Sequence, residues 1–147
     1  MKNKALITGI TGMVGSHLAD FLLEQTDWDV YGVCRWRSPL DNVNHLLDRA
    51  NEKDRLFFEY ADLNDQVSLI HIIKSVKPDF IFHLAAQSYP LTSFTAPIDT
   101  LNTNILGTAR LLEAIRLQMQ DDTNYHPIIH VCASSEVFGK IPAEKKA

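Results

Sequence analysis

Ser134, Ser135 and Glu136 place two hydroxyl groups and a carboxylate directly after an apolar run at residues 128–132. Hydroxyl groups can hold a substrate oxygen, and a carboxylate can accept a proton from a reacting group. An apolar run of this length is typical of a buried strand. The three residues therefore predict a reaction site at the end of a strand.

A glycine-rich segment, TGITGMVG at residues 8–15, stands between an apolar run and a helical pattern. Glycine permits a tight turn and lets backbone N–H groups approach a pyrophosphate at a helix N-terminus. The spacing is one residue longer in its first gap than the usual Gly-x-Gly-x-x-Gly fingerprint. The alternative is a turn with a packing role only. We expect a dinucleotide-binding turn formed by Gly9, Thr11, Gly12, Met13 and Gly15.

Arg35 and Arg37 follow the next apolar run, at residues 29–34, and no acidic residue appears before Asp41. In dinucleotide-binding sheets an acid at this position accepts from the ribose 2′-hydroxyl of NAD, whereas arginine suits the 2′-phosphate of NADP. The alternative is a solvated loop with two surface arginines. The pattern favours NADP over NAD.

Two further segments, YADLND and HLAAQSYP, follow later apolar runs. The Asp62 carboxylate could accept a hydrogen bond from the amino group of adenine, and Leu63 is expected beside it. Small residues after the fourth run would let the chain pass under a cofactor, and polar groups would then lie near the nicotinamide and the substrate. A simple turn is the alternative in each case. The expected residues here are Leu84, Ala85, Ala86 and Gln87 for the cofactor and Ser88 for the substrate.

Strand-like runs alternate with helical patterns along the whole chain. The expected strands are residues 4–8, 29–34, 56–60, 80–85 and 128–133. Such alternation predicts an α/β, Rossmann-type doubly wound parallel sheet in the order 3-2-1-4-5, in which ligands bind beyond the carboxyl ends of the strands. The polar clusters at residues 8–15, 35–38, 62, 85–88 and 134–136 all fall at those ends.

Apolar side chains at helical spacing predict the faces by which the helices pack against this sheet. Residues 77–79, Lys-Pro-Asp, should end the helix that contains Leu69 and Val76, because proline cannot continue a helix. A short helical piece is expected around Leu46. The predicted faces are Val14, Leu18, Phe21 and Leu22; Leu69, Ile72, Ile73 and Val76; and Leu101, Ile105, Leu112 and Ile115.

Composition narrows the class of protein. The 147 residues are 46% hydrophobic with a net charge of −4, which is ordinary for one globular domain and unlike a nucleic-acid-binding surface. No apolar run is long enough for a signal peptide or a membrane span. Cys34 and Cys132 are expected as buried thiols in a reducing cytoplasm. The histidines lack metal-ligand spacing, so we expect no metal site.

Several residues receive a structural interpretation only. His17, His83 and His130 are expected to be packing or edge residues, and Asn104 an exposed or helix-bridging residue. Neither tryptophan, Trp28 or Trp36, is assigned a role.

The chain resembles the N-terminal half of an extended short-chain dehydrogenase/reductase, and most specifically the GDP-mannose 4,6-dehydratase family. The resemblance covers essentially all 147 residues. It rests on the segments TGITGMVGSHLADFLL, VYGVCRWRSP, HLAAQS, GTARLLEAIR and ASSEVFGK, which occur in the family's order. The family's Thr/Ser-Ser-Glu motif matches Ser134, Ser135 and Glu136.

The resemblance implies an NADP-dependent lyase acting on a sugar nucleotide. Hydride is taken from sugar C4, the C5 proton is removed, water leaves from C6, and hydride returns at C6. By resemblance Ser134 holds the C4 oxygen, Glu136 is the C5 base, and Ser135 positions the sugar. We also expect a homo-oligomer, with neither nucleic acid nor membrane as a partner.

Two departures from the family pattern bear on these expectations. Asn102 and Asn104 stand where dehydratases usually carry acids, and the superfamily's Tyr-x-x-x-Lys pair does not occur in the 147 residues. We therefore expect an NADP-binding domain at residues 1–147, without the sixth strand or the sugar-nucleotide domain, and inactive alone. The alternatives are a GDP-4-keto-6-deoxymannose reductase, a UDP-sugar epimerase, or a non-catalytic dinucleotide-binding module.

Overall fold

A five-stranded parallel sheet forms the centre of the molecule, in the order β3-β2-β1-β4-β5. The computed structural model describes residues 2–51, 54–134, 137 and 139. The sheet order and the parallel direction confirm the expected Rossmann-type fold. The strands are β1 (Lys4–Thr8), β2 (Asp29–Cys34), β3 (Leu56–Tyr60), β4 (Phe80–His83) and β5 (Ile128–Val131).

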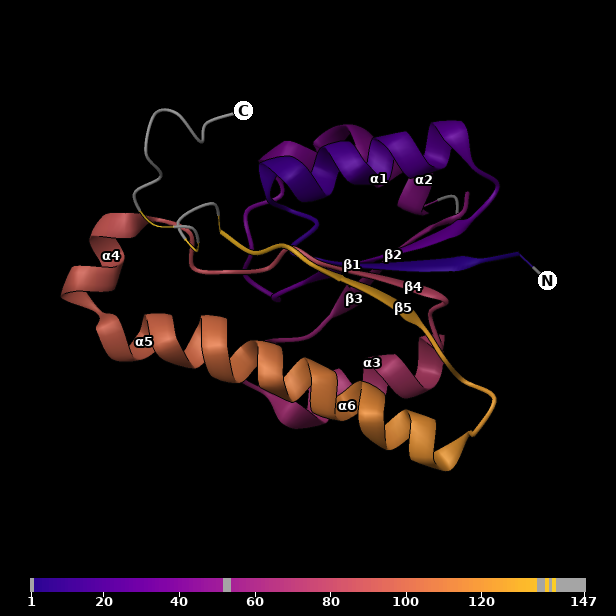
Figure 1. The fold of residues 1–147 in the computed structure, drawn as a ribbon. Coiled ribbons are helices and arrows are strands. Elements are labelled where there is room, and N and C mark those ends of the chain that lie inside the picture. Colours follow the sequence, from indigo (N-terminus) through magenta and orange to yellow (C-terminus); the bar gives the residue numbers. More distant parts are fainter. Residues whose placement is uncertain (1, 52–53, 135–136, 138, 140–147) are drawn as a thin grey trace, which may run out of the picture.

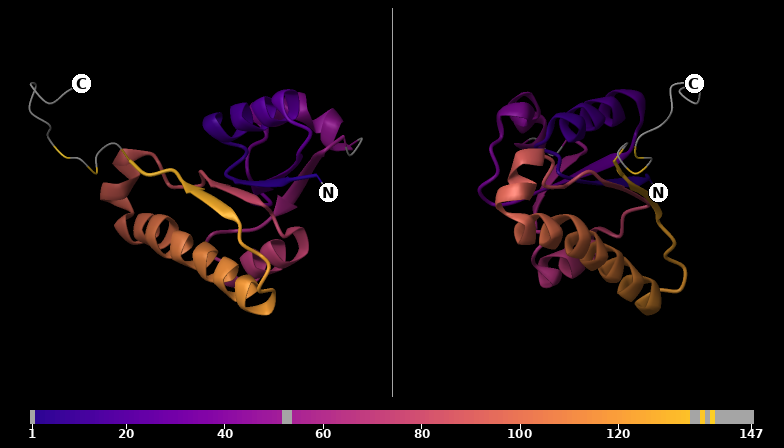
Figure 2. Two further views of the ribbon diagram at one scale, coloured as in Figure 1. Left: turned by 45° about the vertical axis from the view of Figure 1, so that its right-hand side comes forward. Right: turned by 60° about the vertical axis from the view of Figure 1, so that its left-hand side comes forward.

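The sheet has helices on both of its faces (Figures 1 and 2). One face carries α1 (Met13–Gln25), the 3₁₀ helix η1 (Asp41–Leu46) and α2 (Leu47–Asn51); the other carries α3 (Gln66–Val76) and α6 (Gly107–Asp121). Strand β1 is central and pairs with both β2 and β4, so Leu6 lies between Tyr31 and Ile81. Burial on both faces explains why these strands read as continuous apolar runs.

A long helical stretch crosses from the carboxyl ends of the strands to the second face. It comprises α4 (Pro90–Thr95), α5 (Pro97–Leu101), the π-helix η2 (Asn102–Leu106) and α6. The sequence predicts the long helix but not α4. A π-helix within an α-helical stretch often marks a functional site, and η2 lies beside the pocket described below.

Two of the predicted strands are too long by two residues each. Strand β4 ends at His83. The Leu84 amide still donates to the Thr8 carbonyl at 3.3 Å, but it also contacts the Thr8 hydroxyl at 3.2 Å, and the Ala85 amide donates to that hydroxyl and leaves the ladder. Strand β5 ends at Val131. The predicted helix end at residues 77–79 is confirmed, since α3 stops at Val76, directly before Lys77.

The predicted packing faces of two helices are partly wrong. Helix α1 buries Gly15, Ser16, Ala19, Leu22 and Leu23, whereas Val14 and Phe21 are exposed. Small side chains let α1 lie close to the sheet, and a pattern that counts only large apolar residues misses this. Along the long helical stretch Ile115 is buried, but Leu101, Ile105 and Leu112 are exposed.

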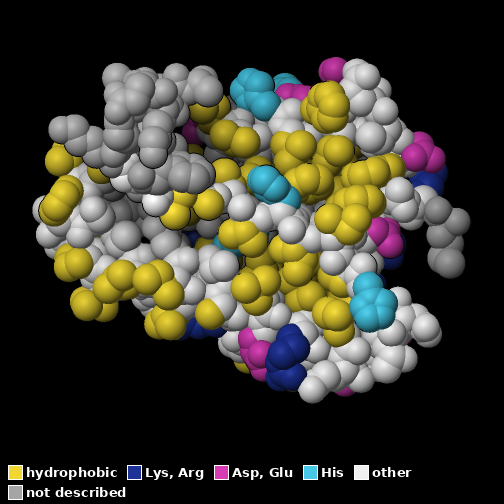
Figure 3. Space-filling view, viewed as in Figure 1, with side chains coloured by type: hydrophobic (Ala, Val, Ile, Leu, Met, Phe, Trp, Pro, Cys, Tyr) yellow, Lys and Arg dark blue, Asp and Glu magenta, His cyan; other side chains and the backbone are white. Residues whose placement is uncertain are grey.

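The edge strand β5 leaves apolar side chains in solvent, as Figure 3 shows over this face. Ile128 and Val131 are 64% and 42% exposed. Cys132 follows this edge and is exposed, so the expectation of a buried thiol is wrong for Cys132 and right for Cys34. Within the described part of the chain, no helix has the length and apolar character that crossing a membrane requires.

Candidate functional site

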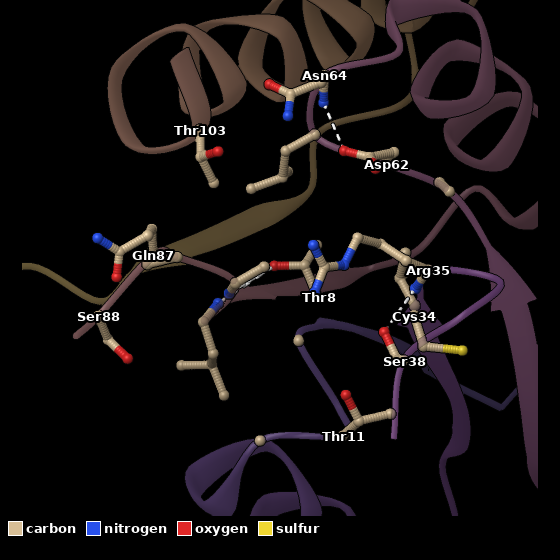
Figure 4. Close-up of a pocket in the computed structure, with 18 of the residues that line it drawn as sticks. Thr8, Thr11, Cys34, Arg35, Ser38, Asp62, Asn64, Gln87, Ser88 and Thr103 are labelled. Atoms are coloured by element: carbon tan, nitrogen blue, oxygen red, sulfur yellow. Dashed lines mark hydrogen bonds between the residues drawn. The ribbon is translucent and has the colours of Figure 1, made fainter. Parts of the chain in front are cut away.

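The main pocket lies at the carboxyl ends of the strands, where ligands bind in open parallel sheets. Its volume is about 350 Å³. Figure 4 shows Gln87 and Ser88 on one side of it and Arg35 and Ser38 on the other. Most of the predicted cofactor and substrate residues line it, namely Gly9, Thr11, Gly12, Arg35, Asp62, Leu63, Leu84, Ala85, Ala86, Gln87 and Ser88.

The remaining predicted residues lie elsewhere. Gly15 is buried one turn into α1, and Met13 at the start of α1 is 70% exposed. Arg37 lines a second hollow beside the pocket. Ser134 is exposed and is not among the residues that line the pocket. Ser135 and Glu136 lie outside the described residues.

The glycine turn between β1 and α1 is shaped for close backbone approach. Gly9 has φ of +77°, and a Cβ there would lie 2.9 Å from the Ala85 backbone. A Cβ on Gly15 would collide with the carbonyl oxygen of Gly9 and lie 2.8 Å from Ile10 Cα. Only glycine fits both positions, which brings the start of α1 against the end of β1.

The N-terminus of α1 points its first amides toward this turn. Among the described residues, no side chain caps Gly12 and no acid occupies the first turn of the helix. Unpaired amides and the helix dipole favour an anion there. The Asn42 side chain braces the turn by donating to the Thr11 carbonyl at 2.9 Å. The turn therefore fits the pyrophosphate of a dinucleotide.

The outer end of the pocket, as we call residues 35–38 together with Asp62, follows β2 and β3. The backbone N–H of Arg35 donates to Ser38 Oγ at 3.2 Å, and the Ser38 amide donates to the Arg35 carbonyl at 3.0 Å. Asp62 Oδ1 accepts from the Asn64 amide at 2.9 Å. Within the described ranges, neither Arg35 nor Arg37 forms an ion pair.

Side-chain hydrogen bonds support one end of the pocket. They join Thr8 and Gln87, which line the cavity, to His83, Asn104 and Thr108, which lie behind its wall. We call these five residues the inner end. The Asn104 side chain accepts from the Gln87 amide at 2.8 Å and donates to the Gln87 carbonyl at 3.0 Å. Residue Asn104 of the π-helix η2 is thus hydrogen-bonded to the backbone of the segment that follows β4. The bridging interpretation of Asn104 is confirmed.

His83 links the two sides of the inner end. Its Nδ1 lies 2.8 Å from Thr8 Oγ1 and its Nε2 lies 3.0 Å from Thr108 Oγ1. Thr108 donates its hydroxyl proton to the Asn104 carbonyl at 2.7 Å. Thr108 must therefore accept from His83, which places the imidazole proton on Nε2 and leaves Nδ1 to accept from Thr8.

Burial sets the charge of this histidine. His83 is only 4% exposed, and burial lowers its pKa below the usual 6.5. The neutral ring fits this chain of hydrogen bonds. Thr8 donates its proton to Nδ1, Nε2–H donates to Thr108, and Thr108 donates its own proton to the Asn104 carbonyl. The packing role expected for His83 is confirmed, and the residue also supports the pocket wall.

The sequence reasoning missed some residues that line the pocket. Asn64 follows β3, and Asp99 and Thr103 come from α5 and η2. No local motif marks the last two, because they reach the pocket only where the long helical stretch crosses the strand ends. Cys34 also lines the pocket, and burial raises the pKa of its thiol. Among the described residues no cluster could hold a metal ion.

The family model and the curated relatives that match this chain carry the same description. A family model described as GDP-mannose 4,6 dehydratase matches residues 6–146. GDP-mannose 4,6-dehydratases of Yersinia enterocolitica, Vibrio cholerae serotype O1 and Homo sapiens are 39%, 42% and 36% identical over 142, 145 and 145 residues. The matches cover 94%, 95% and 95% of this chain but only 37%, 37% and 38% of those relatives. The chain thus spans a little more than a third of the length of these curated relatives.

Solved structures share the fold. The UDP-glucose 4-epimerase of Thermotoga maritima, determined with UDP-glucose, is 30% identical with a TM-score of 0.64 over 76% of this chain and 33% of its own. The PbgP3 protein of Burkholderia pseudomallei has a TM-score of 0.78 at 24% identity, over 98% of this chain and 43% of its own. The second similarity shows the fold alone.

Proposed function

Because the chain belongs to the GDP-mannose 4,6-dehydratase family, we propose that it forms the NADP-binding part of an enzyme that converts GDP-mannose to GDP-4-keto-6-deoxymannose. The observation that carries this proposal is the pocket itself. A glycine turn at a helix N-terminus and Arg35, which has no ion-pair partner among the described residues, line the same cavity. A dinucleotide with an additional phosphate matches both features.

The residues of the pocket fit NADP at each part of the molecule. The amides at the start of α1 would hold the pyrophosphate, and Arg35 would pair with the 2′-phosphate. Asp62 Oδ1 already accepts one backbone amide, and the carboxylate has further acceptor capacity for the adenine amino group. Ala85 and Ala86 are small enough to leave room for the nicotinamide, and Gln87, which Asn104 holds, would lie beside it.

NADP, when bound, supplies reversible hydride transfer, first from sugar C4 and later to C6. The proton chemistry on this chain would be the removal of the C5 proton, together with the positioning of the sugar. The C4 hydroxyl proton would pass to the superfamily's Tyr-x-x-x-Lys pair, which the 147 residues do not contain. In the proposal Ser134 holds the C4 oxygen, Glu136 removes the C5 proton that the 4-keto group acidifies, and Ser135 and Ser88 position the sugar. A carboxylate is required here because a dehydratase moves a C–H proton, which a simple reductase does not.

The reaction can be tested in a chimera in which residues 1–147 replace the matching segment of the Vibrio cholerae relative. The chimera should convert GDP-mannose and exchange the C5 proton with deuterated solvent. Glu136→Gln should lower both rates by about 10²–10⁴-fold, which is the usual loss when a general base is removed. Glu113→Gln, a change on the exposed surface of α6, is the matched control.

The same assay separates the proposal from its alternatives. Conversion of a UDP-sugar to its C4 epimer, without dehydration of GDP-mannose, would establish the epimerase alternative, which the Thermotoga maritima similarity and Asn104 favour. Binding of NADP without any turnover in the chimera would favour a non-catalytic module. We further propose a reducing, cytoplasmic setting, which the two free thiols support.

A further inference from the structure

Trp36 exposes a large indole to solvent at the mouth of the pocket. The side chain is 78% exposed, although burial of an aromatic ring is strongly favourable. It lies in the 35–38 turn, which two hydrogen bonds between Arg35 and Ser38 close. The turn therefore holds the indole in solvent, where it contributes little to the core.

A second hollow next to Trp36 adjoins the main pocket. Arg35, Trp36, Arg37 and Asp62 line it, and Arg35 and Asp62 also line the main pocket. The hollow thus combines one flat apolar ring, two guanidinium groups and one carboxylate. A purine ring that carries phosphate groups and an exocyclic amine matches all three, because indoles stack on bases and guanidinium groups pair with phosphates.

Tyr60 steadies the indole from the neighbouring strand end. The ring centroids of Trp36 and Tyr60 lie 4.9 Å apart at an interplanar angle of 64°, an edge-type aromatic contact. Tyr60 is the last residue of β3, and Asp62 follows it by two residues. A ring restrained before binding loses less conformational freedom when a ligand stacks on it.

We propose that Trp36 is the wall on which the adenine ring of the dinucleotide stacks, with Arg35 and Arg37 on the 2′-phosphate. The inference rests on the proposed function, and it names the residue that recognises the base at the outer end. Gln87 and Ser88, on the opposite side of the pocket, leave that side to the nicotinamide and the sugar (Figure 4).

The two tryptophans allow a direct spectroscopic test. Trp28 precedes β2 and stacks on Phe80 with ring centroids 4.3 Å apart, whereas Trp36 follows the other end of the same strand. The Trp28→Phe variant reports Trp36 alone, and Trp36→Phe reports Trp28 alone. The ligands are NADP and adenosine 2′,5′-bisphosphate, which carries the adenine and the 2′-phosphate without the nicotinamide.

Both ligands should quench the emission of Trp28→Phe in a saturable way and leave Trp36→Phe unchanged. In calorimetric titrations Trp36→Ala should weaken both ligands by about five-fold or more, because base–aromatic stacking contributes that much or more. Trp36→Phe should recover part of the affinity, and Arg116→Ala on the exposed face of α6 should bind as the wild type does. Circular dichroism checks that each variant is folded.

Two outcomes would overturn the inference, and they are distinguishable. If Trp36→Ala binds adenosine 2′,5′-bisphosphate as tightly as the wild type and Trp28→Phe shows no quenching, the adenine lies elsewhere while NADP binding stands. If the wild-type chain binds neither ligand by calorimetry, the proposed NADP function fails and the inference fails with it.

Discussion

The inner and outer ends of the pocket differ in how much of their structure the protein fixes by itself. At the inner end, His83 and Asn104 are hydrogen-bonded on both sides of their polar groups. At the outer end, Arg35, Trp36 and Arg37 are exposed. The comparison indicates that the end nearest the proposed chemistry is rigid before binding, whereas the end that selects the cofactor is completed by the cofactor itself.

The difference leads to separate expectations for stability and affinity. A change at the inner end removes protein–protein hydrogen bonds and should destabilise the fold. A change of the exposed Arg35 or Arg37 side chain at the outer end removes no ion pair among the described residues, so it should weaken ligand binding without unfolding the chain. The glycine turn belongs to neither end, but it lines the pocket and packs closely against the Ala85 backbone, so a change there should affect both properties.

The largest effect is expected for Gly9→Ala. Its φ of +77° and the contact with the Ala85 backbone, 2.9 Å from the new Cβ, leave no relaxed position for a side chain. Strain and overpacking together should cost about 3 kcal/mol of unfolding free energy or more, with loss of NADP binding. Urea denaturation measures the loss. Gly12→Ala is the control, because its Cβ would meet one atom at 3.3 Å; equal stability of the two variants would refute the close approach.

Asn104→Leu should have the next largest effect. The substitution removes the acceptor of the Gln87 amide, and because this hydrogen bond is only part-buried the loss should be about 0.5–1.5 kcal/mol. Asn104→Asp keeps the acceptor and loses the donor when ionised, so it should be intermediate in stability and recover as the pH is lowered. Urea midpoints at several pH values measure both variants. An Asn104→Leu variant as stable as the wild type would show that the inner end does not depend on this contact.

His83 should make stability depend on pH. The unfolded chain binds a proton at this residue near pH 6.5, but burial lowers the folded pKa, so the unfolded state gains the proton first. Stability is therefore full above about pH 6.5 and falls as the pH drops toward the folded pKa. Urea midpoints should decline between pH 7.5 and pH 5.5 in the wild type and decline less in His83→Gln. Equal slopes would place the pH dependence elsewhere.

The smallest effect on stability is expected at the outer end. Arg37→Ala removes an exposed guanidinium that forms no ion pair among the described residues. Its unfolding free energy should stay within about 0.5 kcal/mol of the wild type, as is usual for surface changes, although NADP should bind more weakly. Differential scanning calorimetry and a binding titration on the same sample check both. A clear loss of stability would mean that the outer end is also fixed by the protein.

The observed bounds of three of the five strands, β1, β2 and β3, could be predicted from the sequence. The bounds of β4 could not, because Ala85 continues the apolar run while its amide bonds to the Thr8 hydroxyl. The face of α1 was misjudged for a related reason. Its contact with the sheet uses glycine, serine and alanine, whose importance depends on the distance between the two elements.

The candidate site was predictable where its residues directly follow a strand. Gly9, Arg35 and Asp62 do so, and the pocket brings them together. Asp99 and Thr103 could not be predicted, because their place depends on how a helix crosses the sheet from afar. Trp36 carried no signal in the sequence, and only its exposure beside two arginines gives it a role.

The most direct test of the account is the ratio of NADP to NAD affinity, measured by calorimetry for the wild type and for Arg35→Ala. Charge-assisted bonds to the 2′-phosphate contribute about 1.5–3 kcal/mol. The wild type should therefore prefer NADP by about ten-fold or more, and Arg35→Ala should lose most of that preference while its NAD affinity stays nearly unchanged. Equal affinities of the wild type for NADP and NAD would contradict the account.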